Sequence, residues 1–315
     1  MSNFSELQTL QHPLFEQYQL QVQIKRDDLI DPIISGNKWR KLKYNLKHVK
    51  ENGYKGIISF GGAYSNHIHA LAFACNQHDL HALGIIRGEA HYAENFTLSK
   101  ARKWGMTLHF VDRQTYRERN CEKYLQQLSQ QFPDYFIIPE GGSNVLALRG
   151  VAEICHELNI QTQYDTLITP VGSAGTISGL ISGDNNQHNI LGIAVLKQTD
   201  YLTEEVSALL NDKHNQPLNN WQIFNNYHDG GYAKFSPESL TKLQAFSAVT
   251  GVPFEPIYSG KMILALLDLI NIGYFQPHHK IVLLHTGGLQ GLGGLIEQNK
   301  LKASEWPLPL EQQVR

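Results

Sequence analysis

The sequence predicts an α/β protein with two lobes, each an open, mainly parallel sheet flanked by helices. Short apolar runs alternate with segments of helical periodicity along the chain. Parallel strands need long crossovers, which are usually helices, so this alternation favours parallel sheets. The 315 residues, 42% of them hydrophobic, are enough for roughly two domains at about 150 residues each.

The expected elements follow in chain order from local pattern. Seven apolar or β-branched runs are expected as strands: Gly56 to Phe60, Ala82 to Ile86, Leu108 to Val111, Tyr135 to Ile138, Thr166 to Val171, Ile190 to Leu196 and Lys280 to His285. Four segments are expected as helices: Trp39 to Val49, Leu202 to Leu210, Ser236 to Val249 and Lys261 to Ile272. The third begins with Ser236, Pro237 and Glu238, which suit a cap, a first-turn proline and a first-turn acid. The asparagine-rich segment 211–226 is expected to be a loop or an insertion.

Charge and composition exclude several classes of partner. The 27 Lys and Arg residues nearly balance the 29 Asp and Glu residues, so no global basic field is available for nucleic acid or an anionic membrane. No basic and apolar leader and no long apolar run is present, and the 3 cysteines are widely spaced. We therefore expect a reduced, cytoplasmic protein that acts on a small molecule. No metal is expected, because the 15 histidines form no metal-binding motif.

Four loops rich in small residues follow expected strands. They are Ile58 to His67, Ile137 to Asn144, Thr169 to Gly179 and Leu283 to Gly291. Ligands of parallel α/β sheets bind beyond the carboxyl ends of the strands, where such loops lead into helices. Four of these loops in one chain indicate that several backbone segments approach a common ligand.

The third loop has the composition of a phosphate cup. It comprises Gly172, Ser173, Ala174, Gly175 and Thr176, between a strand and a helix start, where backbone N–H groups and the helix dipole favour an anion. It lacks the lysine of a nucleotide P-loop, and no dinucleotide fingerprint follows the first strand. Tight packing of the helix on the sheet remains an alternative for this loop alone.

A basic cluster near the N-terminus is the second candidate. Lys38, Arg40 and Lys41 follow a Gly-Asn turn and begin an expected helix, where cations are disfavoured by the helix dipole. A nearby phosphate would remove that conflict. A lysine in such a positive setting also has its ammonium form disfavoured, as a Schiff-base lysine requires.

Seven motifs in order resemble one enzyme family. They are KRDDL, SGNKWRKL, GGAYSNH, PEGGSN, GSAGT, EPIYSGK and HTGG. Together they resemble the 1-aminocyclopropane-1-carboxylate deaminase/D-cysteine desulfhydrase family, which uses pyridoxal 5′-phosphate and has the tryptophan-synthase-β-like fold, fold type II. The resemblance implies a homodimer. We expect residues 1–45 with 155–315 to form the larger, cofactor-binding lobe and residues 46–154 the smaller one.

The resemblance also implies roles for individual residues. Lys38 would carry the cofactor as a Schiff base, and Lys41 would hold its phosphate with the Gly172 to Thr176 loop. Asn66 would hydrogen-bond the 3′-oxygen of the cofactor. Ser65 would face the substrate carboxylate, and Tyr258 matches the active-site tyrosine.

Two positions bear on the substrate. Ser259 stands where the deaminases have a glutamate that faces the pyridine nitrogen, and Thr286 matches the desulfhydrase type. Both favour α,β-elimination of D-cysteine to pyruvate, ammonia and hydrogen sulfide, with Lys38 as the base. The alternatives are deamination of 1-aminocyclopropane-1-carboxylate to 2-oxobutyrate and ammonia, another reaction of the fold group, or a catalytically silent pyridoxal-phosphate-binding protein.

Overall fold

Two separate sheets organise the computed structural model, which describes residues 4–197, 200–210 and 217–305. The larger sheet has the order β1 (Leu7–Thr9), β2 (Gln21–Lys25), β10 (Lys280–Leu284), β7 (Thr166–Val171), β8 (Asn189–Ala194) and β9 (Trp221–Phe224). The smaller has the order β5 (Thr107–Val111), β4 (His81–Arg87), β3 (Gly56–Gly62) and β6 (Tyr135–Ile138). Strands β1 and β2 pair antiparallel, and every other pair is parallel. The predicted α/β class with mainly parallel sheets is confirmed.

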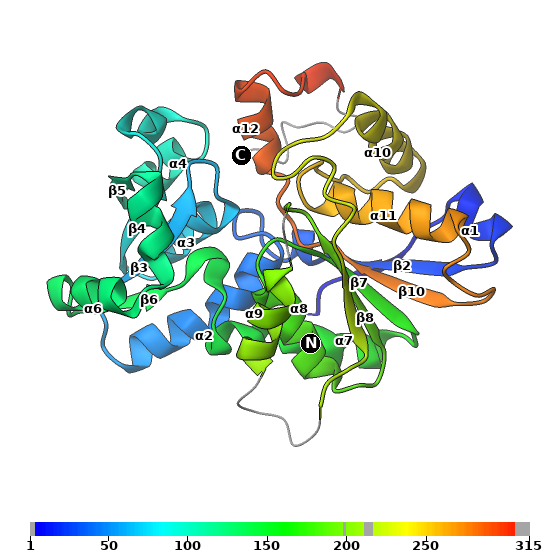
Figure 1. Ribbon diagram of the computed structural model, residues 1–315, viewed down its shortest axis with the longest axis horizontal. Coiled ribbons are helices and arrows are strands. Elements are labelled where there is room, and N and C mark those ends of the chain that lie inside the picture. The colour runs from blue at the N-terminus through cyan, green and yellow to red at the C-terminus, as the bar shows by residue number, and fades with distance from the viewer. Residues whose placement is uncertain (1–3, 198–199, 211–216, 306–315) are drawn as a thin grey trace.

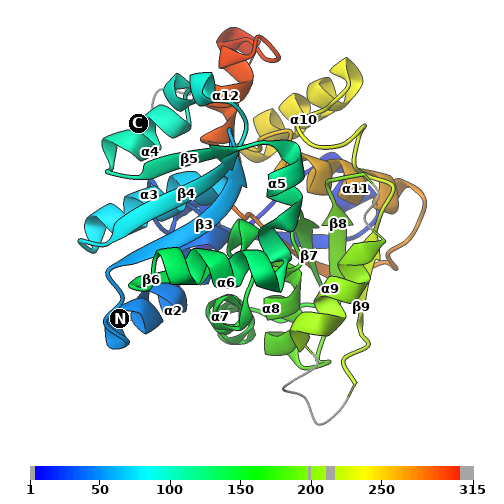
Figure 2. The ribbon, with the colours of Figure 1, turned by 60° about the vertical axis from the view of Figure 1, so that its left-hand side comes forward.

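Helices cover both sheets, as Figures 1 and 2 show. They are α1 (Pro13–Gln17), α2 (Asn37–Glu51), α3 (Asn66–Gln77), α4 (Leu98–Lys103), α5 (Arg113–Arg117), α6 (Glu122–Gln131), α7 (Val145–Gln161), α8 (Gly175–Asp184), α9 (Tyr201–Leu210), α10 (Pro237–Thr250), α11 (Ser259–Asn271) and α12 (Gly291–Glu297). The four expected helices correspond to α2, α9, α10 and α11. The predicted start of α10 is confirmed, since the Ser236 hydroxyl accepts a hydrogen bond from the Ser239 N–H at 3.0 Å.

All seven expected strands are present, but β1, β2 and β9 were not predicted. Strand β9 corrects the expectation that 211–226 is a loop, because residues 221–224 pair with β8 at the sheet edge. Trp221 and Ile223 pack on the core there, so tertiary contacts impose a strand that the polar surroundings conceal. Residues 211–216 of that segment lie outside the described residues.

The larger sheet is buried on both faces. Along β10, Ile281 and Leu283 join the core beneath α10 and α11, whereas Val282 and Leu284 join the core beneath α7 and α8. This explains why the strand reads as a continuous apolar run rather than an alternating one. No helix in the described part of the chain is both long and apolar enough to cross a membrane.

Helices α2 and α7 pack against each other between the two sheets (Figure 1). They approach closely at Gly150, where an added Cβ would lie 2.0 Å from the Arg40 carbonyl oxygen. The expected lobe boundaries, after residues 45 and 154, fall inside these two helices, so where each lobe ends stays a prediction. The packing places the start of α2, with Lys38, between the sheets.

Candidate active site

A cavity of about 1340 Å³ lies at the carboxyl ends of strands from both sheets. All four loops expected to share a ligand contribute to its wall. From the predicted site residues, its lining includes Lys38, Ser65, Asn66, Gly172, Ser173, Thr176, Tyr258 and Thr286. The structure thus brings together residues from distant parts of the chain, as a shared ligand requires.

The turn before α2 aims Lys38 into this cavity. Gly36 has φ +67°, and a Cβ there would lie 1.9 Å from the Thr286 carbonyl oxygen, so only glycine fits. The Asn37 N–H donates to that same oxygen at 3.2 Å, which ties the helix start to the loop after β10. The Lys38 ammonium donates to the Gly141 carbonyl at 3.3 Å.

Two lysines place an excess of positive charge at this end of the cavity: Lys38 lines it and is half-buried, whereas Lys41 is buried and does not line it. Burial lowers the pKa of Lys38 to about 8, although Glu140 opposes the shift. Burial and the neighbouring Lys38 hold the pKa of Lys41 well below its usual range. Within the described residues, neither ammonium has a carboxylate within ion-pair distance. An unpaired buried charge costs on the order of several kcal/mol, so the site favours binding of an anion.

Lys41 connects this positive end to the glycine-rich loop before α8. Its ammonium donates to the hydroxyls of Ser143 at 3.2 Å and Ser173 at 3.5 Å. Those two hydroxyls lie 2.9 Å apart. Of the predicted cup, Ala174 and Gly175 are buried at the start of α8 and do not line the cavity. Hydroxyls, an ammonium and a helix N-terminus therefore converge as an anion site requires.

The start of α3 forms the next part of the wall. Ser65 caps this helix, its hydroxyl accepting from the Ile68 N–H at 3.3 Å, and Asn66 is the first helical residue. His67 was not assigned from the sequence. Its Nε2 lies 2.8 Å from the Ser59 hydroxyl, while Nδ1 is buried without a partner in the described structure. Burial, with Lys38 and Lys41, lowers the pKa of His67 well below its usual range, so the ring is neutral.

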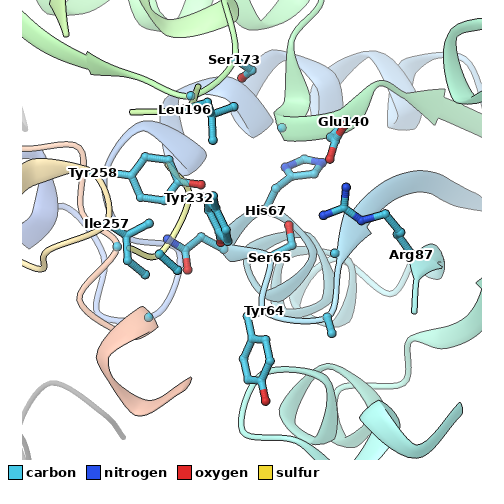
Figure 3. Close-up of a pocket in the computed structure, with 18 of the residues that line it drawn as sticks. Tyr64, Ser65, His67, Arg87, Glu140, Ser173, Leu196, Tyr232, Ile257 and Tyr258 are labelled. Atoms are coloured by element: carbon cyan, nitrogen blue, oxygen red, sulfur yellow. The ribbon is translucent and has the colours of Figure 1, made fainter. Parts of the chain in front are cut away.

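Two tyrosines face the α3 wall across the cavity (Figure 3). Tyr258 packs under Gly172, where an added Cβ would lie 2.8 Å from its ring. The Tyr232 and Tyr258 ring centroids are 6.0 Å apart. Burial and Tyr232 raise the pKa of Tyr258 well above its usual range, so its hydroxyl remains a proton donor. Tyr232 was missed from the sequence, although the preceding Gly230 and Gly231, both at positive φ, signal a special turn.

Ser259 faces away from the cavity. Its hydroxyl donates to Glu255 at 3.0 Å, and the residue is fully buried and does not line the cavity. The contacts of Ser259 give no support to its predicted position beside the pyridine nitrogen, which stays a prediction. Burial raises the pKa of Glu255 to about 7, although N–H groups from Ile257, Tyr258 and Ser259 stabilise its charged form. Sequence reasoning missed this carboxyl group.

The residues present fit pyridoxal phosphate. Lys38 supplies an amine whose neutral form is accessible near pH 8. Lys41, Ser143 and Ser173 form a cup for a phosphate whose charge would compensate the buried ammonium groups. The buried Nδ1 of His67 lacks a partner among the described residues, so a polar ligand group in the cavity would satisfy it.

Comparison with known proteins agrees with this geometry. The sequence profile of the family described as "Pyridoxal-phosphate dependent enzyme" matches residues 6–287. The chain is therefore a pyridoxal-phosphate-dependent enzyme of fold type II.

Individual relatives show which family of pyridoxal-phosphate-dependent enzymes the chain resembles. The chain is 30% identical over 288 residues to a "Putative 1-aminocyclopropane-1-carboxylate deaminase" of Pyrococcus abyssi, covering 86% of this chain and 85% of that protein. It is 30% identical over 308 residues to the "Bifunctional D-cysteine desulfhydrase/1-aminocyclopropane-1-carboxylate deaminase" of Arabidopsis thaliana, covering 90% and 76%. A crystal structure described as "the ACC deaminase homologue" matches with a TM-score of 0.77 and 26% identity, covering 96% and 94%. The chain belongs to the 1-aminocyclopropane-1-carboxylate deaminase/D-cysteine desulfhydrase family, a group of lyase-type enzymes.

Proposed function

We propose that this enzyme catalyses α,β-elimination of D-cysteine to pyruvate, ammonia and hydrogen sulfide. The observation that carries the proposal is the position of Lys38, whose buried amine lies at the mouth of an anion cup with a pKa lowered to about 8. Such an amine can both hold a carbonyl cofactor and take a proton near neutral pH. Thr286, which lines the cavity, matches the desulfhydrase type and favours D-cysteine; Ser259 does not line the cavity, so the absence of a glutamate there supports D-cysteine from the sequence alone.

Each residue of the site is given a role in cofactor binding or proton transfer according to its position. Bound pyridoxal phosphate supplies an electron sink for the charge that forms when the α-proton leaves. Lys41, Ser143 and Ser173 hold the phosphate, and Asn66 contacts the 3′-oxygen. Lys38, freed as an amine when substrate binds, takes the α-proton.

Tyr258 and Ser65 act on the substrate. The Cβ–S bond breaks, the sulfur leaves with the bonding electrons, and the Tyr258 hydroxyl donates a proton to it. The raised pKa of Tyr258 means that its hydroxyl carries a proton before the sulfur leaves. Ser65, at the start of α3, positions the substrate carboxylate, and one water then converts the released aminoacrylate to pyruvate and ammonia.

The second candidate is deamination of 1-aminocyclopropane-1-carboxylate. The names of relatives support it, because the Pyrococcus abyssi protein is named for that activity alone and the Arabidopsis thaliana protein for both. Both reactions need the same lysine and cofactor, so only the product separates them.

The predicted homodimer and the predicted cytoplasmic location accompany either activity. The homodimer can be tested by measuring the mass of the holoenzyme in solution.

The test is product analysis of the purified holoenzyme. D-Cysteine should yield pyruvate and sulfide in equal amounts, and L-cysteine should yield far less. Formation of 2-oxobutyrate from the cyclopropane amino acid, without sulfide from D-cysteine, would overturn the proposal in favour of the second candidate. Turnover of neither compound would contradict both.

A further inference from the structure

The wall at the end of β4 carries a positive group that the proposed reaction does not use. Arg87 is the last residue of β4, and its side chain points into the cavity from the side opposite Tyr232 and Tyr258 (Figure 3). Gly62 leaves space beside it, because even an added Cβ there would lie 3.6 Å from the Arg87 Nη2 atom. A guanidinium placed this way can reach a ligand in the cavity.

The contacts around Arg87 leave its hydrogen-bonding capacity open. Its guanidinium carbon lies 5.4 Å from the centroid of the Tyr116 ring, which orients the group. Among the described residues no carboxylate pairs with it. The adjacent acid, Glu140, is occupied: Tyr116 donates to one oxygen at 2.7 Å and Arg119 to the other at 2.6 Å.

Other acids along this wall also have partners of their own. Asp112 accepts from the Thr115 N–H at 2.8 Å and caps α5, and Glu89 lies 3.4 Å from His91. The guanidinium offers five donors in a planar fork that matches a carboxylate. Glu205 also lines the cavity, where it lies near Arg119 and accepts a hydrogen bond from the Ala174 backbone N–H. With these acids occupied by other groups, Arg87 faces the cavity without a carboxylate partner in the described structure, so this part of the wall can bind an anion.

The α-carboxylate of an amino acid already has donors at the start of α3, although Ser65 lies on the same side of the cavity as Arg87 (Figure 3). Under the proposed function it lies at the start of α3, with Ser65. The cavity, at about 1340 Å³, is larger than the roughly 300–1,000 Å³ of ordinary small-molecule sites, but it must hold pyridoxal phosphate as well as the substrate, and it extends to Arg87. Arg87 is therefore available for a different part of the substrate.

We propose that Arg87 binds an acidic group in the substrate side chain, so that the preferred substrates are amino acids with a second carboxylate beyond the β-leaving atom. This deepens the proposed function and rests on it. A thioether with a terminal carboxylate is the chemical class that fits. Lys38 takes its α-proton, the Cβ–S bond breaks, and the carboxylated thiolate leaves with the bonding electrons. One water then completes formation of pyruvate and ammonia.

The test compares two nearly isosteric substrates on the holoenzyme. S-Carboxymethylcysteine carries the distal carboxylate, and S-carbamoylmethylcysteine carries a neutral amide in its place; both are supplied as D- and L-forms. Dissociation constants come from the change in the cofactor absorption band, and kcat/KM from pyruvate release. We expect a preference of about 10- to 100-fold for the carboxylate, the size of a charge-assisted hydrogen-bond pair.

Three variants separate a specific contact from general charge. Arg87→Gln should abolish the preference and leave the amide substrate within about twofold of wild type, whereas Arg87→Lys should restore part of the preference. Arg113→Gln removes a positive charge from the same cavity and should leave the preference unchanged. An equal loss on both substrates in Arg87→Gln would instead place the arginine at the α-carboxylate or the leaving sulfur, and would overturn the proposal.

The D-cysteine reaction, run in parallel, distinguishes failure of this inference from failure of the proposed function. Turnover of D-cysteine without any carboxylate preference, or without binding of either analogue, overturns only the role of Arg87. Absence of pyruvate and sulfide from D-cysteine overturns the proposed function. A carboxylate preference in binding that Arg87→Gln removes would still support the distal contact.

Discussion

The cations at the inner end of the cavity, Lys38 and Lys41, and those at the outer end, Arg87 and Arg119, differ in burial and in charge pairing. At the inner end, half-buried Lys38 and buried Lys41 lie beside hydroxyls and a carbonyl, and the described structure pairs neither with a carboxylate. At the outer end, Arg119 pairs with Glu140, and Arg87 is exposed. Buried cations of this kind require a ligand that stays, whereas exposed ones can exchange ligands at little cost. We therefore expect the cofactor at the inner end and propose that the variable part of the substrate binds at the outer end.

The largest effect should come from Lys38→Ala at the inner end. Loss of the base and of the covalent attachment should lower kcat/KM by about 10³-fold or more, and the visible absorption band of the bound cofactor should disappear. Lys47→Ala, on the exposed side of the same helix, is the control and should behave as wild type. A Lys38→Ala enzyme that kept the band would refute the assignment of this lysine.

The next largest effect should come from Lys41→Met, which keeps the length of the side chain but removes its charge. The affinity for pyridoxal phosphate should fall by about 10- to 100-fold, as expected for loss of a charged hydrogen-bonding group. Lys43→Met, which removes an exposed lysine paired with Glu153, should leave cofactor affinity unchanged. Equilibrium dialysis measures both. Equal affinity in the Lys41 and Lys43 variants would show that the inner end does not hold the phosphate.

The pH dependence of cofactor uptake should reveal the buried amine. With the pKa of Lys38 lowered to about 8, its neutral fraction, and hence the rate of covalent uptake by apo-protein, should rise about tenfold between pH 7 and 9. Above about pH 9 the rate should level off. The phosphate group itself contributes no change in this range, because its second pKa is about 6. A rise centred near pH 10.5 would mean that Lys38 is not desolvated.

The smallest effect should come from Arg119→Gln at the outer end. Its ion pair with Glu140 is partly exposed, so its loss should change the free energy of unfolding by about 1 kcal/mol or less. Cofactor affinity should stay within about twofold of wild type. Urea unfolding and dialysis check both values. A marked loss of cofactor affinity in Arg119→Gln would contradict the assignment of the cofactor to the inner end.

Sequence motifs located several residues of this cavity, because each motif joins a small-residue turn to a helix start. Lys38, Ser65, Asn66 and Tyr258 all line the cavity, and their roles there stay predictions. The outer end was missed. Arg87 lies at the end of a strand and carried a usable signal, but local sequence does not show that Glu140 is occupied by Tyr116 and Arg119 and does not pair with Arg87.

Arg40 shows the opposite error of sequence reasoning. It belongs to the same basic cluster as Lys38 and Lys41, yet it turns away from the cavity into buried ion pairs with Asp27 and Glu157. On a helix, residues two apart face different directions, so Lys38 can face the cavity while Arg40 forms buried ion pairs. The carboxylates of Asp27 and of Glu157 on α7 therefore decide which cation of the basic cluster is turned away from the cavity.

The sequence by itself determined the fold class, the cofactor and the family, because glycine-rich turns after strands and a lysine at a helix start are local features with local physical reasons. Only the tertiary structure decided which way Ser259 faces. It also decided that, among the described residues, His67 Nδ1 has no hydrogen-bond partner and Arg87 has no carboxylate partner. Each of these depends on which groups from other segments surround the side chain. Hydrogen-bond satisfaction and charge pairing are properties of that surrounding, and local sequence does not specify them.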